Sequence, residues 1–191
     1  MQAIRTPQQE SAEDIFFGQI VIIWARWFLI LAGTILTLWG TNNTNDLVIY
    51  IVPIVALMAM NFYLHGRYLM ERPANWRLLL VSSSIDVFII TLIIAMWQPK
   101  GLDNQFFIFY YPAVLAVSFV FPRRISAIYT LAVGLAYTAV CFIANTSFLI
   151  HVADQKTLFQ RLILMGAIAG VGTFYWRIER ERRREAENGR S

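Results

Sequence analysis

A cluster of polar residues stands directly before a run of aromatic residues near the middle of the chain. The polar members can donate or accept hydrogen bonds, and they are Lys100, Asp103, Asn104 and Gln105. The aromatic members begin at the next position, and they are Phe106, Phe107, Phe109, Tyr110 and Tyr111. Hydrogen-bonding groups beside flat ring faces are suited to a lipid-soluble ring compound that carries a carbonyl. The other interpretation is an ordinary connection between two membrane spans that carries an aromatic belt.

A second group of polar side chains lies inside apolar stretches. Asp86 stands several turns into one such stretch, where an ionisable group is costly and is by default a functional hypothesis. We expect it to be a structural polar lock or a carboxyl that senses a proton or a ligand. Its expected partner is Asn61 or a tyrosine such as Tyr110 or Tyr137, and a protonated carboxyl is the alternative. Asn61 is itself expected to hydrogen-bond between helices.

Three other features carry weaker chemical signals. Gly166 and Gly170 form a G-x-x-x-G spacing, which lets helix backbones approach closely, either in a dimer or inside one bundle. Cys141 is the single cysteine and is expected to be a small core residue. His151 and Asp154 are too few for a metal site, so no metal is expected. We find no catalytic constellation.

The elements that must position these residues are apolar helices. The chain has 191 residues, of which 58% are hydrophobic and 15% charged, which is too apolar for an average soluble domain. Six apolar runs approach the roughly 20 residues that span a bilayer as a helix, and they are 24–39, 47–64, 78–97, 106–121, 125–144 and 158–176. We therefore predict an all-α polytopic membrane protein, a bundle of six transmembrane helices. Residues 1–23 are expected to form a polar N-terminus and an interfacial helix, and 177–191 a charged cytoplasmic helix.

The positive charges predict how the chain is oriented. If both termini are cytoplasmic, all but three of the 16 lysines and arginines lie inside. The three outside are Lys100, Lys156 and Arg161, so the bias follows the positive-inside rule. Arg26 and Arg161 are expected to extend toward the headgroups. The net charge of +4 thus indicates contact with anionic lipid, not with nucleic acid. Beyond residue 176, opposite charges four apart, Arg177 with Glu181 and Arg183 with Glu187, predict that the last helix continues into water.

Several segments together resemble the membrane-embedded input region of bacterial sensor histidine kinases. They are G-L-D-N-Q-F at 101–106, F-Y-Y-P-A-V-L-A at 109–116 and F-P-R-R at 121–124, with Asp86 before them. The most similar type is the redox-responsive kinase, which carries a G-G-x-x-N-P-F turn between its third and fourth spans that is implicated in ubiquinone sensing. Gly101, Asn104 and Phe106 match that turn, whereas Lys100 replaces the first glycine and Gln105 the proline.

The resemblance implies a sensory or anchoring membrane module in the bacterial inner membrane, with a quinone as its implied ligand. The chain shows no phospho-acceptor histidine in a dimerisation helix and no Gly-rich nucleotide lid, so we expect no kinase activity of its own. The expected partners are the lipid bilayer, a second copy through the last span, or a larger membrane complex. The alternative is an accessory integral membrane subunit of a respiratory or photosynthetic complex.

Overall fold

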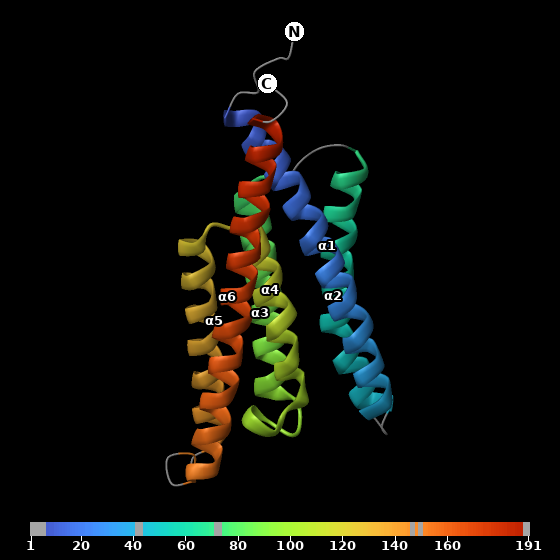
Figure 1. Cartoon of the computed structure of the whole chain (residues 1–191). Coiled ribbons are helices and arrows are strands. Elements are labelled where there is room, and N and C mark those ends of the chain that lie inside the picture. The colour runs from blue at the N-terminus through green and yellow to red at the C-terminus, as the bar shows by residue number, and fades with distance from the viewer. Residues whose placement is uncertain (1–6, 41–43, 71–73, 146–147, 149–150, 189–191) are drawn as a thin grey trace. The chain divides into compact units, whose positions relative to one another are not determined.

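The computed structural model describes residues 7–40, 44–70, 74–145, 148 and 151–188, and these residues are mainly helical with no strand among them (Figure 1). The predicted all-α class is confirmed for this part of the chain. Contacts divide the chain into two compact units, residues 1–89 and 90–191, with the boundary inside the third helix. Each unit is described by itself.

Each predicted apolar run overlaps an α-helix, but the helix boundaries differ from those of the runs. The helices are α1 (Pro7–Gly40), α2 (Thr44–Leu69), α3 (Trp76–Met96), α4 (Tyr110–Val120), α5 (Arg123–Ala144) and α6 (Val152–Asn188). Within the described residues, four segments are long and apolar enough to cross a membrane: Gly18–Trp39, Trp76–Met96, Arg123–Ala144 and Val152–Glu179. The length and composition of these four helices are those of a membrane protein.

The fourth run differs most from its prediction. It begins with a 3-10 segment, η2 (Gln105–Phe109), so that α4 contains only 11 residues. Pro112 lies in the first turn of α4, a position where the missing N–H of proline costs little.

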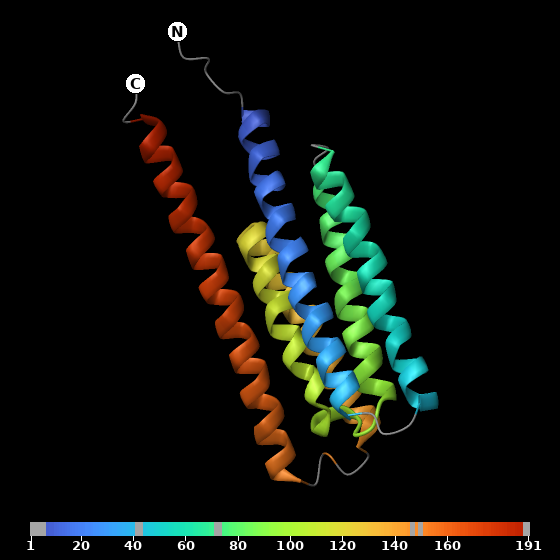
Figure 2. The same cartoon turned by 90° about the vertical axis from the view of Figure 1, so that its right-hand side faces the viewer.

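The first unit contains α1, α2 and the first part of α3. Helices α1 and α2 lie side by side, as both views show (Figures 1 and 2). Their apolar contact is made by a buried cluster of Ile30, Ile54 and Leu57, which Trp27, Met58 and Ile89 cover. Gln19 adds a polar connection within this unit, since its Nε2 donates to the Leu64 carbonyl at 3.0 Å and its Oε1 accepts from the Ala74 N–H at 2.8 Å.

The second unit is built around α4. Gly172 of α6 lies so close to α4 that a Cβ there would stand 2.7 Å from the Ser118 Cβ, which explains a glycine at this position. The Ser118 hydroxyl also meets the Ser126 hydroxyl of α5 at 2.8 Å. Side chains of α4 that face this packing, such as Val114 and Val117, are fully buried.

Helix α6 is one continuous helix from Val152 to Asn188. The predicted pair is present near its end, where Arg177 Nε donates to Glu181 Oε1 at 2.9 Å. The side chain of Arg183, which we expected to pair with Glu187, lies outside the described residues. The helix therefore runs without a break from the unit's turn region into a charged segment.

Candidate functional site

The predicted binding turn is a compact structure that is closed by its own polar groups. It begins with η1 (Gly101–Asp103), and Gly101 has a φ of 65°, a conformation that glycine adopts readily. Asn104 closes the turn, because its Nδ2 donates to the Trp97 carbonyl at 3.2 Å and its Oδ1 accepts from the Phe106 N–H at 2.8 Å. Both Gly101 and Asn104 are buried. Their role in the structure is to shape the turn and to start η2.

The turn also packs closely against the end of α5. A Cβ on Gly101 would stand 2.8 Å from the Ala144 Cβ and 3.6 Å from the Cys141 Cα. Cys141 is itself buried, as expected for a small core residue. Any side chain larger than hydrogen at position 101 would separate η1 from α5.

Rings that surround the turn form a contiguous aromatic layer. Phe106 meets Trp97 edge-on with ring centroids 5.1 Å apart, and it meets Phe109 at 5.4 Å. Tyr110 is fully buried, and its hydroxyl lies 2.7 Å from the Thr91 hydroxyl. The predicted aromatic residues are thus brought together, but partly as internal packing.

Arg161 of α6 joins this layer to the rest of the unit. Its Nη1 donates to the Leu102 carbonyl of η1 at 2.6 Å and to the Tyr137 hydroxyl of α5. Its guanidinium carbon also lies 3.5 Å from the centre of the Phe107 ring, which is cation–π geometry. Phe107 in turn stacks on Tyr137 at 6.3 Å and meets Tyr111 at 5.9 Å. One arginine therefore connects η1, η2, α5 and α6.

This finding corrects the expectation that Arg161 extends toward the headgroups. Its side chain is half-buried and turns inward because a carbonyl, a hydroxyl and a ring face offer it three partners at one depth. Tyr137 and Arg161 stand at similar distances from the facing ends of α5 and α6, and this equal depth is a sequence signal for the contact.

The remaining predicted turn residues face outward. Lys100, Asp103 and Gln105 are exposed, whereas Phe106 and Phe107 are partly buried. The outer surface of the turn thus carries exposed polar side chains and two partly exposed rings, whereas Asn104 is buried beneath it. It could accept a flat ring with a carbonyl at its edge.

A separate polar centre lies inside the first unit. Arg26 of α1 holds Asp86 of α3 in a bidentate ion pair, with Nε 2.9 Å from Oδ1 and Nη2 2.6 Å from Oδ2. Arg26 is 1% exposed and Asp86 5%. The expectation that Arg26 reaches the headgroups is therefore wrong, and Asp86 has a partner that we did not predict.

The cause is the length of α1. An apolar run that starts at Trp24 would put Arg26 at the membrane boundary, but the apolar span begins at Gly18, so Arg26 stands well inside it. A cation at that depth must find an anion or be expelled. Asn61, proposed as the partner of Asp86, instead donates from Nδ2 to the Ile23 carbonyl at 3.3 Å. It thus bonds between helices, from α2 to α1.

The G-x-x-x-G residues are not positions at which this structure requires glycine for close packing between described helices. A Cβ on Gly166 or Gly170 would meet nothing within 4 Å, and both glycines are exposed. Gly172, two residues further along, is the glycine of α6 that permits close packing on α4. Among the described residues, no group of three or more His, Cys, Asp or Glu side chains could hold a metal ion.

Comparison of the chain with protein-family models, with curated proteins and with solved structures finds no match to any of them.

Proposed function

We propose that the chain is a six-span sensory or anchoring module of the type that precedes the kinase core in bacterial sensor histidine kinases. In this proposal both termini lie in the cytoplasm, and α2 and α4 complete the membrane crossings made by the other four helices. The turn between α3 and α4 binds a lipid-soluble ring compound of the quinone class. The chain senses and transmits, and it performs no chemistry.

One observation carries the proposal: Arg161 contacts both parts of the turn, η1 and η2, and belongs to the helix that continues into the charged C-terminal segment. Its contacts with Leu102 and Phe107 place the turn and α6 in direct mechanical connection. From Arg161 to Asn188, α6 continues as one helix for about 40 Å at a rise of roughly 1.5 Å per residue. A ligand that shifts Phe107 would therefore shift Arg161 and the helix that carries it. Such transmission requires two arrangements to which the ligand binds unequally.

Ligand binding is tested with the full chain in nanodiscs and ubiquinone-1 as the probe. The informative variants are Gln105→Leu and Phe107→Leu, which remove an exposed amide and a ring face. The matched controls are Gln160→Leu and Phe159→Leu, because both of these side chains are exposed on α6 beside Arg161. We expect the turn variants to raise the Kd about fivefold or more, the equivalent of one lost hydrogen bond. The controls should stay within about twofold of the parent.

Transmission is tested in a Cys141→Ser background that carries spin labels at positions 124 and 185, which are exposed on α5 and α6. Ubiquinone-1 should shift the distance between the two labels, and Arg161→Gln should abolish the shift while it leaves measurable binding. Absence of saturable binding by the parent protein would remove the sensory proposal. Isolation from native membranes as a fixed member of a pigmented complex would favour the accessory-subunit alternative instead.

A further inference from the structure

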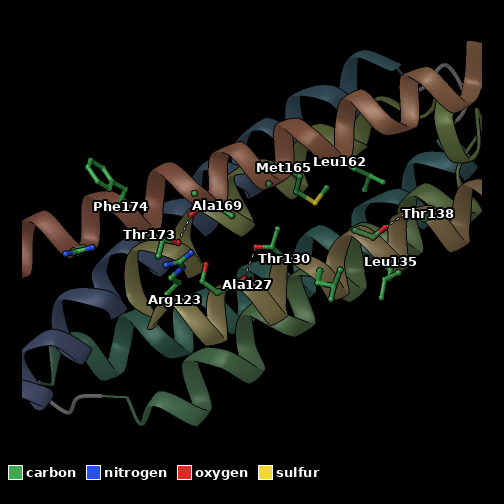
Figure 3. A pocket seen from close by; sticks show the side chains of 16 residues that line it. Arg123, Ala127, Thr130, Leu135, Thr138, Leu162, Met165, Ala169, Thr173 and Phe174 are labelled. Carbon is green, nitrogen blue, oxygen red and sulfur yellow. Dashed lines mark hydrogen bonds between the residues drawn. The ribbon is translucent and has the colours of Figure 1, made fainter.

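A long groove lies between α5 and α6, away from the turn. It encloses about 710 Å³, and Figure 3 shows side chains from both helices along it. Arg123 and Arg177 line one end, and Thr138 and Leu162 stand toward the other. Along α5, the distance from Arg123 to Thr138 is about 22 Å at roughly 1.5 Å per residue. The groove is therefore longer than half of a hydrocarbon core of about 30 Å.

The walls of the groove offer few polar groups to an occupant. Three threonines line it, but each hydroxyl donates to the carbonyl four residues earlier in its own helix, as the dashed lines of Figure 3 show for some of them. The distances are 2.8 Å for Thr130, 2.7 Å for Thr138 and 2.6 Å for Thr173. A threonine that bonds its own backbone in this way has satisfied its donor. The Ser126 hydroxyl, which also lines the groove, is paired with that of Ser118. Apart from the two arginines at one end, the remaining lining residues, among them Leu135 and Met165, are apolar or glycine.

The width of the groove comes from missing side chains on α6. Gly166 and Gly170 both line it, and apart from adjacent residues and the backbone of α6 itself, no atom lies within 4 Å of the position that a Cβ on either would take. Gly134 on α5 also lines it. Leu162 approaches to 3.3 Å from the position that a Cβ on Gly134 would take, so the open stretch lies along Gly166 and Gly170. An apolar groove that is open at these glycines is suited to a flexible hydrocarbon chain.

The end with the arginines is suited to an anion. Arg123 is the first residue of α5, where backbone N–H groups without helical partners add to the positive potential. Arg177 pairs with Glu181, but this pair is exposed, and exposed pairs of this kind are weak. A phosphate could accept from both arginines without the cost of breaking a strong contact.

We propose that the groove binds one anionic phospholipid, with its phosphate at Arg123 and Arg177 and an acyl chain along α5 and α6 past the glycines. Basic pockets between membrane helices on the cytoplasmic side bind such headgroups through the same chemistry.

The charge at the groove's end favours a lipid over a second copy of the chain. Two copies related by an axis along the membrane normal would bring the arginines of one copy toward those of the other. Like charges at such an interface oppose association, whereas a phosphate diester neutralises them.

The test is native mass spectrometry of the full chain in mild detergent, with phosphatidylglycerol and phosphatidylcholine of identical acyl chains as the probes. The charge variant is R123Q/R177Q. Its control is R124Q/R182Q, which removes the same charge from exposed positions of the same helices that do not line the groove. The channel variant is Gly170→Leu, and its control is Ala167→Leu, an exposed position of α6 outside the groove. Circular dichroism verifies that each variant is folded.

We expect the parent to retain one phosphatidylglycerol with about tenfold preference over phosphatidylcholine, and R123Q/R177Q to lose most of that preference. Gly170→Leu should reduce retention of both lipids several-fold, and both controls should stay within about twofold of the parent. Equal retention of the two lipids by the parent, or equal losses in R123Q/R177Q and R124Q/R182Q, would overturn the proposal. So would a lipid-free dimer that Gly170→Leu converts to monomer, because the groove would then be an interface between copies. If Gly170→Leu fails to fold, the pair of charge variants decides the outcome alone.

Discussion

Removal of one member of the Arg26–Asp86 pair should destabilise the first unit more than a single substitution of an exposed apolar side chain does. Asp86→Leu leaves the guanidinium of Arg26 without an anion. Because Arg26 is only 1% exposed, water cannot replace the lost carboxylate. Removal of one partner from a buried pair costs about 3–5 kcal/mol. An arginine at the centre of a membrane helix costs roughly 2.5–3.5 kcal/mol by insertion measurements, which agrees with the lower part of that range. We therefore expect Asp86→Leu to lower the free energy of unfolding by about 3 kcal/mol.

The double variant Arg26→Met with Asp86→Leu separates the ion pair from simple packing. With both charges absent, no uncompensated charge remains, and buried pairs replaced by apolar residues are often neutral in stability. We expect the double variant to be more stable than either single variant, with a coupling free energy of about 2 kcal/mol or more. The matched control is Ser84→Ala, two residues from Asp86 on α3. The Ser84 side chain is exposed, and its hydroxyl donates to the Leu80 carbonyl of the same helix at 2.9 Å.

The assay is reversible unfolding in mixed detergent micelles with increasing dodecyl sulfate, followed by tryptophan fluorescence and circular dichroism. Ser84→Ala should change the free energy of unfolding by less than about 0.5 kcal/mol. The reasoning is refuted if Asp86→Leu lies within about 1 kcal/mol of the parent, or if the two single effects simply add in the double variant.

Two further predictions concern the turn and use the same unfolding assay. Gly101→Ala should cost about 2 kcal/mol, because a Cβ at a φ of 65° is strained and would stand 2.8 Å from that of Ala144. Gly66→Ala, where a Cβ meets nothing within 4 Å, should be neutral or stabilising, and equal effects at the two glycines would contradict the packing argument. Asn104→Ala should cost about 1–2 kcal/mol through the two lost hydrogen bonds that close the turn. Gln105→Ala, at the exposed neighbour, should change little, and an equal loss there would show that Asn104 does not close the turn.

The helices were predictable because an apolar run near spanning length leaves the backbone few alternatives to a helix. Their boundaries were less so. The helix α1 begins at Pro7 and its apolar span at Gly18, whereas the most apolar run begins at Trp24, and this offset moved Arg26 from the boundary to the interior. The late start of α4 follows from Asn104, whose side chain caps η2 first.

The candidate site was predictable in composition but not in its contacts. Polar and aromatic residue types between 100 and 111 indicated a turn that could bind a ligand. The rotation of α6 about its own axis, however, cannot be predicted from a nearly uniform apolar pattern. The contact of Arg161 with Phe107 therefore could not be derived from spacing alone. The same holds for Arg26 and Asp86, which lie 60 positions apart on different helices.

The side-chain amide of Gln19 bears on how the protein is assembled during synthesis. It bonds the Leu64 carbonyl near the end of α2 and the Ala74 N–H just before α3, so a residue of α1 fastens both sides of the α2–α3 connection. Translation delivers α1 first, and N-terminal parts generally become structured before later ones. The Gln19 amide is thus present before α2 and α3 are synthesised. In a permuted chain with α1 last, α2 and α3 would have to insert without these two hydrogen bonds.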